Sequence, residues 1–339
     1  MRTFKELFEK VYGRLDLSTE ESKDAVYSMM EGFWEPSQIG AFLTALHIKG
    51  ETPEEVAGFA LAMRDMAVPV PMHDVQALDT CGTGGDRKGS FNVSTITAMV
   101  LAGAGVPVIK HGNRAISSRC GSADLLEALG IRCRLQPEEV AEAVAETGFA
   151  FLYAPDYHPA TASVAELRKQ LGVPTIFNLL GPLTNPARPA AQFIGVYDRQ
   201  AMDLMAGAIR IMDPHKRATL IHSIDGWDEA TPCCDFLLYP LHGKPSWVNS
   251  RLFGIDPCNP EDMAGGSSLE NARICLSVLS GGKNAWRSIV LLNATLAAMA
   301  YYPDCSDKEA LELVTLSVDS GSAMNVILKL RQKFPGEPV

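Results

Sequence analysis

The sequence predicts an α/β protein in which an all-helical segment, residues 1 to about 68, precedes a larger α/β region from about residue 75 with a largely parallel sheet. In the first region, apolar residues recur at helical spacing. In the second, short β-branched or apolar runs alternate with helical patterns, which indicates strand–helix–strand units. Between the regions, Pro69 and Pro71 flank Val70. Because proline stiffens and extends the chain, this stretch is the expected linker.

The N-terminal region carries four helical patterns. In the first, apolar side chains recur at i, i+3, i+4 and i+7 from Phe4 onwards. Two later patterns begin with a serine or threonine followed three residues on by a glutamate, which is typical of a capping box. We therefore expect helices from Phe4, from Ser18–Glu21, from Ser37 to Gly50 and from Thr52–Glu55 to Met66.

The α/β region contains seven strand candidates with helical patterns between most of them. We expect strands at 76–79, 106–110, 131–135, 149–153, 192–197, 217–222 and 236–239. Helices fit at 95–103, 123–129, 138–147, 199–212 and 268–280, with further helical patterns at 284–302 and 307–333. Pro137 opens the helix at 138–147, and Gly130 and Gly148 stand where helices are expected to end.

Composition and charge limit the class of protein. The chain has 339 residues, 47% hydrophobic and 21% charged, enough for two domains or one large one. Its net charge of −10 and pI near 5.2 exclude a global basic field for nucleic acid or an anionic membrane. An anionic substrate is repelled at long range, but salt screens that repulsion beyond about 8 Å, so a local cation cluster can still bind it.

The N-terminus is amphipathic and lacks the apolar core of a signal peptide, and the longest apolar runs are too short to span a membrane. The eight cysteines form no C-x-x-C pair, and several lie within apolar runs. These observations favour reduced thiols in a cytoplasmic protein over a disulfide framework or a zinc site.

A glycine-rich stretch from Asp79 to Thr95 runs into the helical pattern at 95–103. Its glycines at 82, 84 and 85 permit close backbone approaches. Ser94 or Thr95 can cap the helix and leave amide N–H groups facing an anion, most often phosphate. The dinucleotide and P-loop fingerprints do not fit. The alternative is a glycine-rich surface turn before an ordinary capped helix.

A second loop, 110–122, follows the strand expected at 106–110 and is rich in cations and hydroxyls. Open α/β sheets bind ligands at the carboxyl ends of their strands. Two anion sites on neighbouring strand–helix units favour a ligand with phosphates at both ends, held by charge-assisted hydrogen bonds of about 1.5–3 kcal/mol each. Taken alone, this loop could also be a solvated cationic surface.

Acidic residues cluster at 225–229, just past the strand expected at 217–222. Adjacent carboxylates suit Mg²⁺, which prefers one or two carboxylates with phosphates and waters, although such pairs also occur on plain surfaces. Asp86 does not help to bind phosphate and is expected to orient amides or a ligand hydroxyl. Arg168, near a Pro- and Asn-rich segment, could clamp a carboxylate or form a surface salt bridge.

Together these stretches resemble the anthranilate phosphoribosyltransferase family across nearly the whole chain. The resemblance is carried by the helical N-terminus and by Gly82-Thr-Gly-Gly-Asp86, Asn92-Val-Ser-Thr95, Lys110-His-Gly-Asn-Arg114, Gly121-Ser-Ala-Asp124, Phe177-Asn-Leu-Leu-Gly-Pro-Leu183 and Asp225-Gly-Trp-Asp-Glu229. It implies transfer of phosphoribose from phosphoribosyl pyrophosphate to the amine of anthranilate, a step of tryptophan synthesis. It also implies a homodimer whose small helical domain, residues 1–70 joined by part of 160–187, is hinged to an α/β domain at 75–339.

By position, the resemblance implies a donor site lined by Gly82, Gly85, Asp86, Ser90, Asn92, Val93, Ser94, Thr95, Lys110, His111, Gly112, Asn113, Arg114, Ala115, Ile116, Ser117, Ser118 and Ser122. It implies that Mg²⁺ is held by Ser94, Asp228 and Glu229. Anthranilate would meet Asn113, Arg168 and the backbone at Gly82. The chain departs from the family at Pro174, Cys120 and Trp227, where Arg, Ser and Leu are usual.

The implied reaction needs no strong base, because the amine of anthranilate is a neutral nucleophile and catalysis is mainly positioning and electrostatics. One alternative is a pyrimidine nucleoside phosphorylase, which would use inorganic phosphate and need no acidic metal pair. Another is a non-catalytic relative that binds nucleic acid. Such a relative is expected to lose the glycine-rich loop or gain a basic face, and this sequence does neither.

Overall fold

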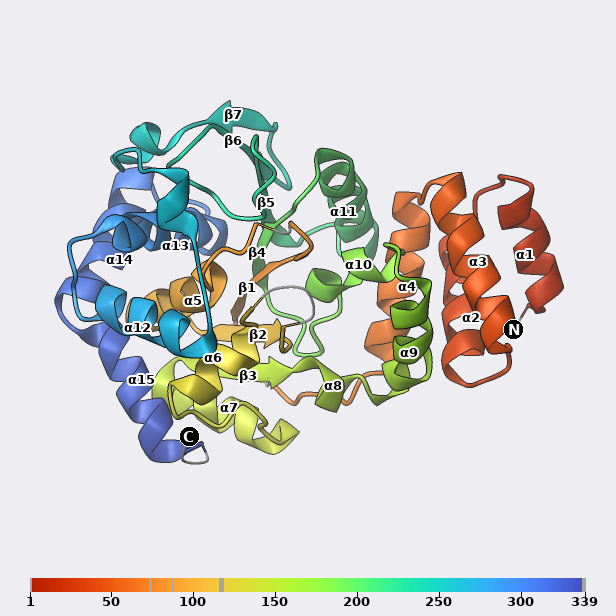
Figure 1. Cartoon of the computed structure of the whole chain (residues 1–339), viewed down its shortest axis with the longest axis horizontal. Coiled ribbons are helices and arrows are strands. Elements are labelled where there is room, and N and C mark those ends of the chain that lie inside the picture. The colour runs from red at the N-terminus through yellow and green to blue at the C-terminus, as the bar shows by residue number, and fades with distance from the viewer. Residues whose placement is uncertain (1, 73–74, 87, 116–118, 337–339) are drawn as a thin grey trace. The chain divides into compact units, whose positions relative to one another are not determined.

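The computed structural model describes residues 2–72, 75–86, 88–115 and 119–336, and Figure 1 traces them from the red N-terminus to the blue C-terminus. They form two compact units. The helical unit comprises Met1–Pro69, Pro155–Pro186 and Gln200–Lys216. The sheet unit comprises Val70–Ala154, Ala187–Arg199 and Arg217–Val339. No single helix among the described residues is long and apolar enough to cross a membrane, although the bent pair 307–319 and 322–333 passes the same test of length and composition.

The helical unit is built from helices of three separate chain segments. Its helices are α1 Phe4–Tyr12, α2 Thr19–Met30, α3 Pro36–Lys49, α4 Pro53–Asp65, α8 Ala154–Tyr157, α9 Ala162–Leu171, α10 Phe177–Leu180 and α11 Arg199–Met212, with 3-10 turns at Pro159–Thr161 and Gly181–Leu183. The four helices expected in the N-terminal region are therefore present. The third begins at Pro36 rather than Ser37, because proline at the first helical position is pre-organised for a helix.

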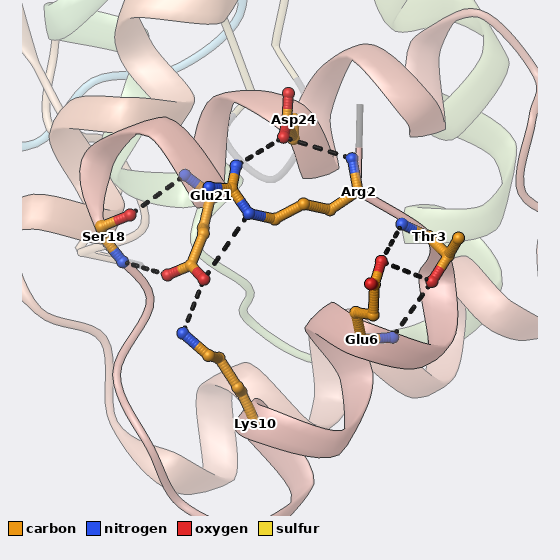
Figure 2. Close-up of polar contacts among 7 residues, drawn as sticks. All are labelled: Arg2, Thr3, Glu6, Lys10, Ser18, Glu21 and Asp24. Carbon is orange, nitrogen blue, oxygen red and sulfur yellow. Dashed lines mark hydrogen bonds and ion pairs between the residues drawn. The ribbon is translucent and has the colours of Figure 1, made fainter.

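Capping boxes fix the ends of the N-terminal helices. Ser18 Oγ accepts the Glu21 N–H at 3.3 Å, and the Glu21 carboxylate accepts the Ser18 N–H at 2.9 Å. The same carboxylate binds Lys10 of α1 at 2.6 Å, and Arg2 binds Asp24 of α2 at 2.7 Å (Figure 2). The boxes expected at Ser18 and Thr52 are both confirmed. Such caps stabilise a helix by about 1 kcal/mol each.

Close packing explains why the later segments join the N-terminal helices. Phe177 of α10 packs edge-on against Phe59 of α4, with ring centroids 5.8 Å apart. The helix at 199–212 is present as predicted, but it joins the helical unit, whereas the predicted boundaries place it in the α/β domain. Its Gly207 faces the first turn of α4, where an added Cβ would lie 2.7 Å from Pro53 Cβ. A glycine at this point lets the two helices approach closely.

The sheet unit contains a seven-stranded sheet of order β3-β2-β1-β4-β5-β6-β7. The strands are β1 Leu78–Gly82, β2 Val108–Gly112, β3 Phe149–Tyr153, β4 Ala191–Gly195, β5 Arg217–Ser223, β6 Phe236–Pro240 and β7 Ser246–Val248. Strands β1 to β5 run parallel, and β6 and β7 are antiparallel to their neighbours. The predicted mostly parallel sheet beside a helical N-terminal domain is confirmed.

Two differences from the expected strands have local causes. The strand expected at 131–135 does not form: the Arg132 N–H bonds the Phe334 carbonyl oxygen, and Ile131 makes only an isolated bridge with Pro335. This segment thus pairs with the C-terminal segment instead of the sheet. The short strand β7 was not predicted, because its three residues lie half-exposed or exposed at a sheet edge and show no apolar run.

Helices cover the sheet and meet over its middle strands. They are α5 Val93–Gly103, α6 Ser122–Ala128, α7 Pro137–Thr147, α12 Ser268–Leu279, α13 Ala285–Tyr301, α14 Asp307–Asp319 and α15 Ser322–Lys333, with 3-10 turns at Ser250–Phe253 and Pro260–Met263. Helix α5 packs on β1 and β2, and α13 packs on β4 and β5. The single helical pattern expected at 307–333 is divided, because Gly321 adopts φ of 78° between α14 and α15.

Candidate active site

The middle of the sheet is a topological switch point. From β1 the chain proceeds to β2 and β3 on one side, then returns to β4 on the other side of β1. Gly82 and Gly195, the last residues of these neighbouring parallel strands, are paired in register. Open α/β sheets bind ligands in the crevice beyond the carboxyl ends of strands at such a point.

The loop that follows β5 lies directly over these two glycines. An added Cβ at Gly195 would stand 1.5 Å from the Asp228 carbonyl oxygen, and one at Gly82 would stand 2.6 Å from Asp228 Oδ2. The Asp228 carboxylate accepts a hydrogen bond from the Gly84 N–H at 3.0 Å. The acidic cluster predicted at 225–229 is therefore in contact with the glycine-rich loop. We call Asp228 and Glu229, both only 9% exposed, the acidic corner.

The start of α5 meets the other half of the acidic corner. The sequence predicts Ser94 or Thr95 as the cap of this helix, but α5 begins at Val93 with Asn92 at the N-cap position. Ser94 therefore lies in the first turn, where its backbone N–H donates a hydrogen bond to the Glu229 carboxylate. A carboxylate at this position is stabilised by the positive end of the helix dipole.

Lys110, at the end of β2, carries a positive charge into the same region. It is 2% exposed, and its Nζ donates hydrogen bonds to the Thr80 carbonyl oxygen and to Ser94 Oγ, the latter at 3.1 Å. Its charge also lowers the pKa of Glu229, although burial outweighs this effect. Lys110 and His111 thus belong to the strand end, since β2 extends two residues beyond the expected strand.

The carboxyl groups of Asp86, Asp228 and Glu229 are near enough to influence one another's ionisation. Burial, with the nearby charge of Asp86, raises the pKa of Asp228 to about 7. Burial and the charge of Asp228 also raise the pKa of Glu229 well above its ordinary value. Asp86 Oδ2 is buried and accepts no hydrogen bond from the described residues. Carboxyl groups that raise one another's pKa in this way would be stabilised in their ionised forms by a cation.

The donor set at this corner fits Mg²⁺, which prefers carboxylate oxygens and keeps several waters or phosphates as ligands. Among the described residues, no three His, Cys, Asp or Glu side chains already surround a common point. A cation here would therefore take only part of its coordination from protein. That arrangement is typical of Mg²⁺ sites that are completed by substrate phosphates.

The second loop is tied to the first by hydroxyl and amide groups. Thr95 Oγ1 bonds Ser122 Oγ at 3.0 Å, which joins the starts of α5 and α6. Asn92 Nδ2 donates to the Cys120 carbonyl oxygen at 3.1 Å. Asn92 itself is held by Asn271, whose Oδ1 accepts its N–H at 3.0 Å. The two loops predicted to form anion sites are therefore brought together.

Arg114 has a different set of partners from those expected of a phosphate ligand. Its guanidinium pairs with Glu127 and, at 3.1 Å, with Asp124, and it lies 5.9 Å from the centre of the Tyr153 ring. The Asp124 carboxylate also accepts the N–H groups of Ala115 and Gly121 at 2.9 and 2.8 Å. Asp124 thus shapes this loop, a role that the sequence pattern does not predict.

The remaining predicted donor-site residues occupy varied positions. Val93 is fully buried in the core, so only its backbone can reach a ligand. Ser90 forms an isolated bridge with Ala264, and Gly85 adopts φ of 83° in the loop. Gly112 would meet Phe151 at 2.9 Å if it carried a Cβ, and the Asn113 carbonyl oxygen accepts the Ala123 N–H. Ile116, Ser117 and Ser118 lie outside the described residues.

Arg168 lies in the helical unit, on α9. Its guanidinium carbon is 5.0 Å from the centre of the Phe177 ring, and burial lowers its pKa. It forms no ion pair with the described residues. A partly buried arginine on an aromatic ring, without a carboxylate partner, is suited to bind an anionic group of a ligand.

Some residues of the site have contacts that the sequence pattern does not predict. Thr80 and Gly195 act through their backbone, and Asn271 reaches Asn92 from 179 residues away. Trp227 is buried and lies 5.7 Å below Lys88 Nζ of the glycine-rich loop. Isolated residues of these types occur throughout proteins, so only the fold shows their role.

Comparisons with known proteins agree with this geometry. Residues 5–67 match the helical bundle domain of a glycosyl transferase family, and residues 74–324 match the a/b domain of a glycosyl transferase family. Anthranilate phosphoribosyltransferase from Persephonella marina is 43% identical over 337 residues, covering 98% of this chain and 99% of that protein. The enzyme of the same name from Desulfitobacterium hafniense is 44% identical over 319 residues, 93% of this chain and 94% of that protein.

Solved structures give the same result. Anthranilate phosphoribosyltransferase from Thermus thermophilus has a TM-score of 0.90 at 38% identity, covering 96% of this chain and 99% of that one. The Saccharomyces cerevisiae enzyme in complex with PRPP and Mg has a TM-score of 0.89 at 27% identity, covering 96% of both chains. This chain therefore belongs to the anthranilate phosphoribosyltransferase family.

Proposed function

We propose that this chain transfers the phosphoribosyl group of phosphoribosyl pyrophosphate to the amine of anthranilate, releasing pyrophosphate, as a step of tryptophan biosynthesis. The observation that carries the proposal is the meeting of the glycine-rich loop, Lys110 and the acidic corner at the switch point of the sheet. Amides, an ammonium group and carboxylates there offer partners for phosphates and for a cation. The yeast relative with PRPP and Mg supports the assignment.

Asp228 and Glu229, with Ser94 beside them, are the proposed ligands of Mg²⁺, and the orphaned oxygen of Asp86 faces the same corner. Bound Mg²⁺ would neutralise negative charge on the pyrophosphate group. Without a cation, the raised pKa values of Asp228 and Glu229 favour their protonated forms. Cation binding therefore competes with protons at this corner.

The chain's own residues would act by positioning and electrostatics. Backbone amides of the glycine-rich loop, apart from those of Thr83 and Gly84, which bond Gly195 and Asp228, would hold the phosphates of the donor. As the bond from ribose C1 to pyrophosphate loosens, positive charge develops on the sugar, and the amine of anthranilate attacks C1. No strong base is needed, since this amine is neutral. Pre-organised groups of this kind contribute several kcal/mol each to transition-state stabilisation.

Arg168 is the proposed partner of the anthranilate carboxylate. Its guanidinium is held over Phe177, which leaves the planar fork available for a bidentate contact. Pro174 lies six residues further along the chain, at a position where the family resemblance leads us to expect arginine. The acceptor pocket of this chain is therefore proposed to rely on Arg168 more than those of relatives do.

The test of the reaction follows the fluorescence of anthranilate in a mixture of protein, phosphoribosyl pyrophosphate and Mg²⁺. We expect the signal to decay only when all three are present. Phosphorolysis of thymidine or uridine without Mg²⁺, with anthranilate unchanged, would instead favour a pyrimidine nucleoside phosphorylase. Tight binding to nucleic acid with neither activity would favour a non-catalytic relative, against the net charge of −10.

A homodimer is the proposed assembly, formed through the helical unit. A hollow of about 940 Å³ on this unit is lined by residues of α1, α3 and α9 and is mainly apolar. Tyr12 and Ile48 at its edge are 76% and 68% exposed. Exposed apolar patches of this kind mark interaction sites.

A cytoplasmic location is proposed as well. The structure describes all eight cysteines, and each carries a thiol, as in a reducing compartment.

A further inference from the structure

Two thiols outside the candidate active site are in contact. The Sγ atoms of Cys233 and Cys258 are 3.4 Å apart, although the residues are 25 positions apart in the chain. Cys233 follows the acidic corner, and Cys258 lies between the 3-10 turns at Ser250–Phe253 and Pro260–Met263. Both are half-buried, so small reagents can reach them. A disulfide has an S–S length of about 2.05 Å, so the two sulfur atoms would need to approach by roughly 1.4 Å.

We propose that Cys233 and Cys258 form a redox-sensitive dithiol that hydrogen peroxide converts to an intrachain disulfide. In the first step, the thiolate of one cysteine attacks a peroxide oxygen, giving a sulfenic acid and hydroxide, so sulfur is oxidised and the peroxide is reduced. In the second, the other thiolate attacks the sulfenic sulfur. The S–S bond forms, the S–O bond breaks, and the departing hydroxide takes a proton to become water.

The surroundings favour this pair over other pairs that include Cys234. Cys234 is adjacent in sequence, but its Sγ lies 3.3 Å from Thr231 Oγ1. Burial raises the pKa of both Cys233 and Cys258, and the carboxylate of Asp262 adds to the effect. Both groups are therefore thiols at neutral pH, so their oxidation is slower than that of an exposed cysteine. The contact between them then captures the sulfenic acid once it forms, because the second sulfur is already in place.

The bridge would join two segments that border the glycine-rich loop. Ala230, between the acidic corner and Cys233, is fixed to α13 by two hydrogen bonds with the Asn293 side chain, at 3.0 and 2.8 Å. The segment after Cys258 pairs with the end of the glycine-rich loop: the Phe91 N–H bonds the Met263 carbonyl oxygen at 3.0 Å, and Ser90 forms a bridge with Ala264. The modification does not depend on the proposed reaction.

The test treats the full-length protein with hydrogen peroxide, alkylates the remaining thiols and maps tryptic peptides without reduction by mass spectrometry. Cleavage after Arg251 separates Cys233 from Cys258, so a disulfide appears as two linked peptides, two hydrogens lighter than their sum. We expect this species in the wild-type protein and in the matched control Cys234→Ser. It should be absent from Cys233→Ser and Cys258→Ser, and dithiothreitol should release both peptides.

Two results would overturn the proposal. One is a wild-type map in which Cys258 is alkylated or carries a sulfinic or sulfonic acid and no linked peptides form. The other is a linked species that persists in Cys233→Ser and disappears in Cys234→Ser, which would assign the bridge to Cys234. Because the readout is a peptide mass, a protein without phosphoribosyl transfer would leave the outcome unchanged, so the two proposals fail separately.

Discussion

The main-chain carbonyl oxygen of Asp228 lies 1.5 Å from the point that a Cβ atom at Gly195 would occupy. Any side chain at Gly195 would therefore collide with the backbone of the acidic corner, not merely with a flexible side-chain tip. A Cβ atom added at Gly82, the partner of Gly195 in the sheet, would lie 2.6 Å from Oδ2 of the Asp228 carboxylate. The two glycines at the strand ends are what allow the acidic corner to rest on the sheet.

Gly195→Ala should therefore displace the acidic corner. Overpacking of this kind costs about 1–3 kcal/mol, so the free energy of unfolding should fall by that amount and the rate of phosphoribosyl transfer by at least about tenfold. Urea unfolding and initial rates across a Mg²⁺ titration measure both effects. Gly181→Ala is the control, because its added Cβ would meet no atom within 4 Å and its φ is −47°. Equal behaviour of the two variants would contradict the prediction.

The double variant Asp228→Asn, Glu229→Gln tests the acidic corner itself. We expect it to lose stimulation by Mg²⁺ and to retain less than about a hundredth of the transfer rate, since a charged ligand contributes several kcal/mol. Without Mg²⁺ its melting temperature should rise, because the two buried carboxyl groups, whose pKa values are raised on folding, ionise more readily in the unfolded chain, and neutral amides remove this destabilisation. Thermal unfolding of the wild type and the double variant, each with and without Mg²⁺, measures these melting temperatures. Asp225→Asn, an exposed neighbour, should behave as the wild type, and normal Mg²⁺ dependence of the double variant would refute the assignment.

Arg168→Ala should weaken anthranilate binding far more than donor binding. A charge-assisted hydrogen bond contributes about 1.5–3 kcal/mol, which corresponds to an increase of about tenfold to a hundredfold in the KM for anthranilate. The KM for phosphoribosyl pyrophosphate should change little. Steady-state kinetics with each substrate varied in turn separate the two values. The exposed neighbour Lys169→Ala is the control, and equal losses for both substrates would place Arg168 elsewhere.

The fold and the loops of the site were predictable because they follow from local patterns. Capping boxes at Ser18 and Thr52 and the strand at 149–153 are each set by residues within a few positions of one another. The start of α5 was not predictable in the same way. Ser94 was expected at the cap because serine favours that position, yet its N–H serves Glu229, a residue that the fold brings from 135 positions away.

The same distinction explains the other differences. Residues 131–135 have the composition of a strand, but their partner proved to be the C-terminal segment at Phe334, which no local pattern indicates. The helix at 199–212 was predicted correctly, while its packing on Pro53 depends on a single glycine. Arg114 remains a predicted donor-site residue, and its ion pairs with Glu127 and Asp124 on α6 are contacts that no local pattern indicates. Long-range pairing of this kind is visible only in the folded chain.

Ile48→Glu should dissociate the proposed homodimer. Ile48 is 68% exposed at the edge of the apolar hollow on α1, α3 and α9, where a buried carboxylate without a partner would cost several kcal/mol. Sedimentation velocity should show a shift from dimer to monomer, with unchanged far-UV circular dichroism. Leu316→Glu is the control, because Leu316 is 64% exposed on α14 of the sheet unit. A wild-type monomer, or a variant that stays dimeric, would contradict the interface.

His158 should make the protein less stable in mild acid. Burial lowers the pKa of this histidine from 6.5 to about 4, and hydrogen bonds with the backbone of Thr184 and Met63 oppose the shift only in part. Between these two values the unfolded chain binds a proton that the folded chain excludes, so stability is lost as the pH falls from about 6.5 to about 4. At about 1.4 kcal/mol for each pKa unit, the loss approaches about 3 kcal/mol.

The measurement compares urea unfolding of the wild type and His158→Gln at several pH values from 7 down to 4. This pH range covers the pKa of the histidine in the unfolded chain, 6.5, and in the folded chain, about 4. The variant should be less stable at neutral pH, because its side chain fills the buried site poorly, but its stability should depend less on pH in this window. His215→Gln removes an exposed histidine and should keep the pH dependence of the wild type. A neutral amide takes up no proton in this pH range. If His158→Gln shows the same pH dependence of stability as the wild type, the acid sensitivity therefore arises from other groups.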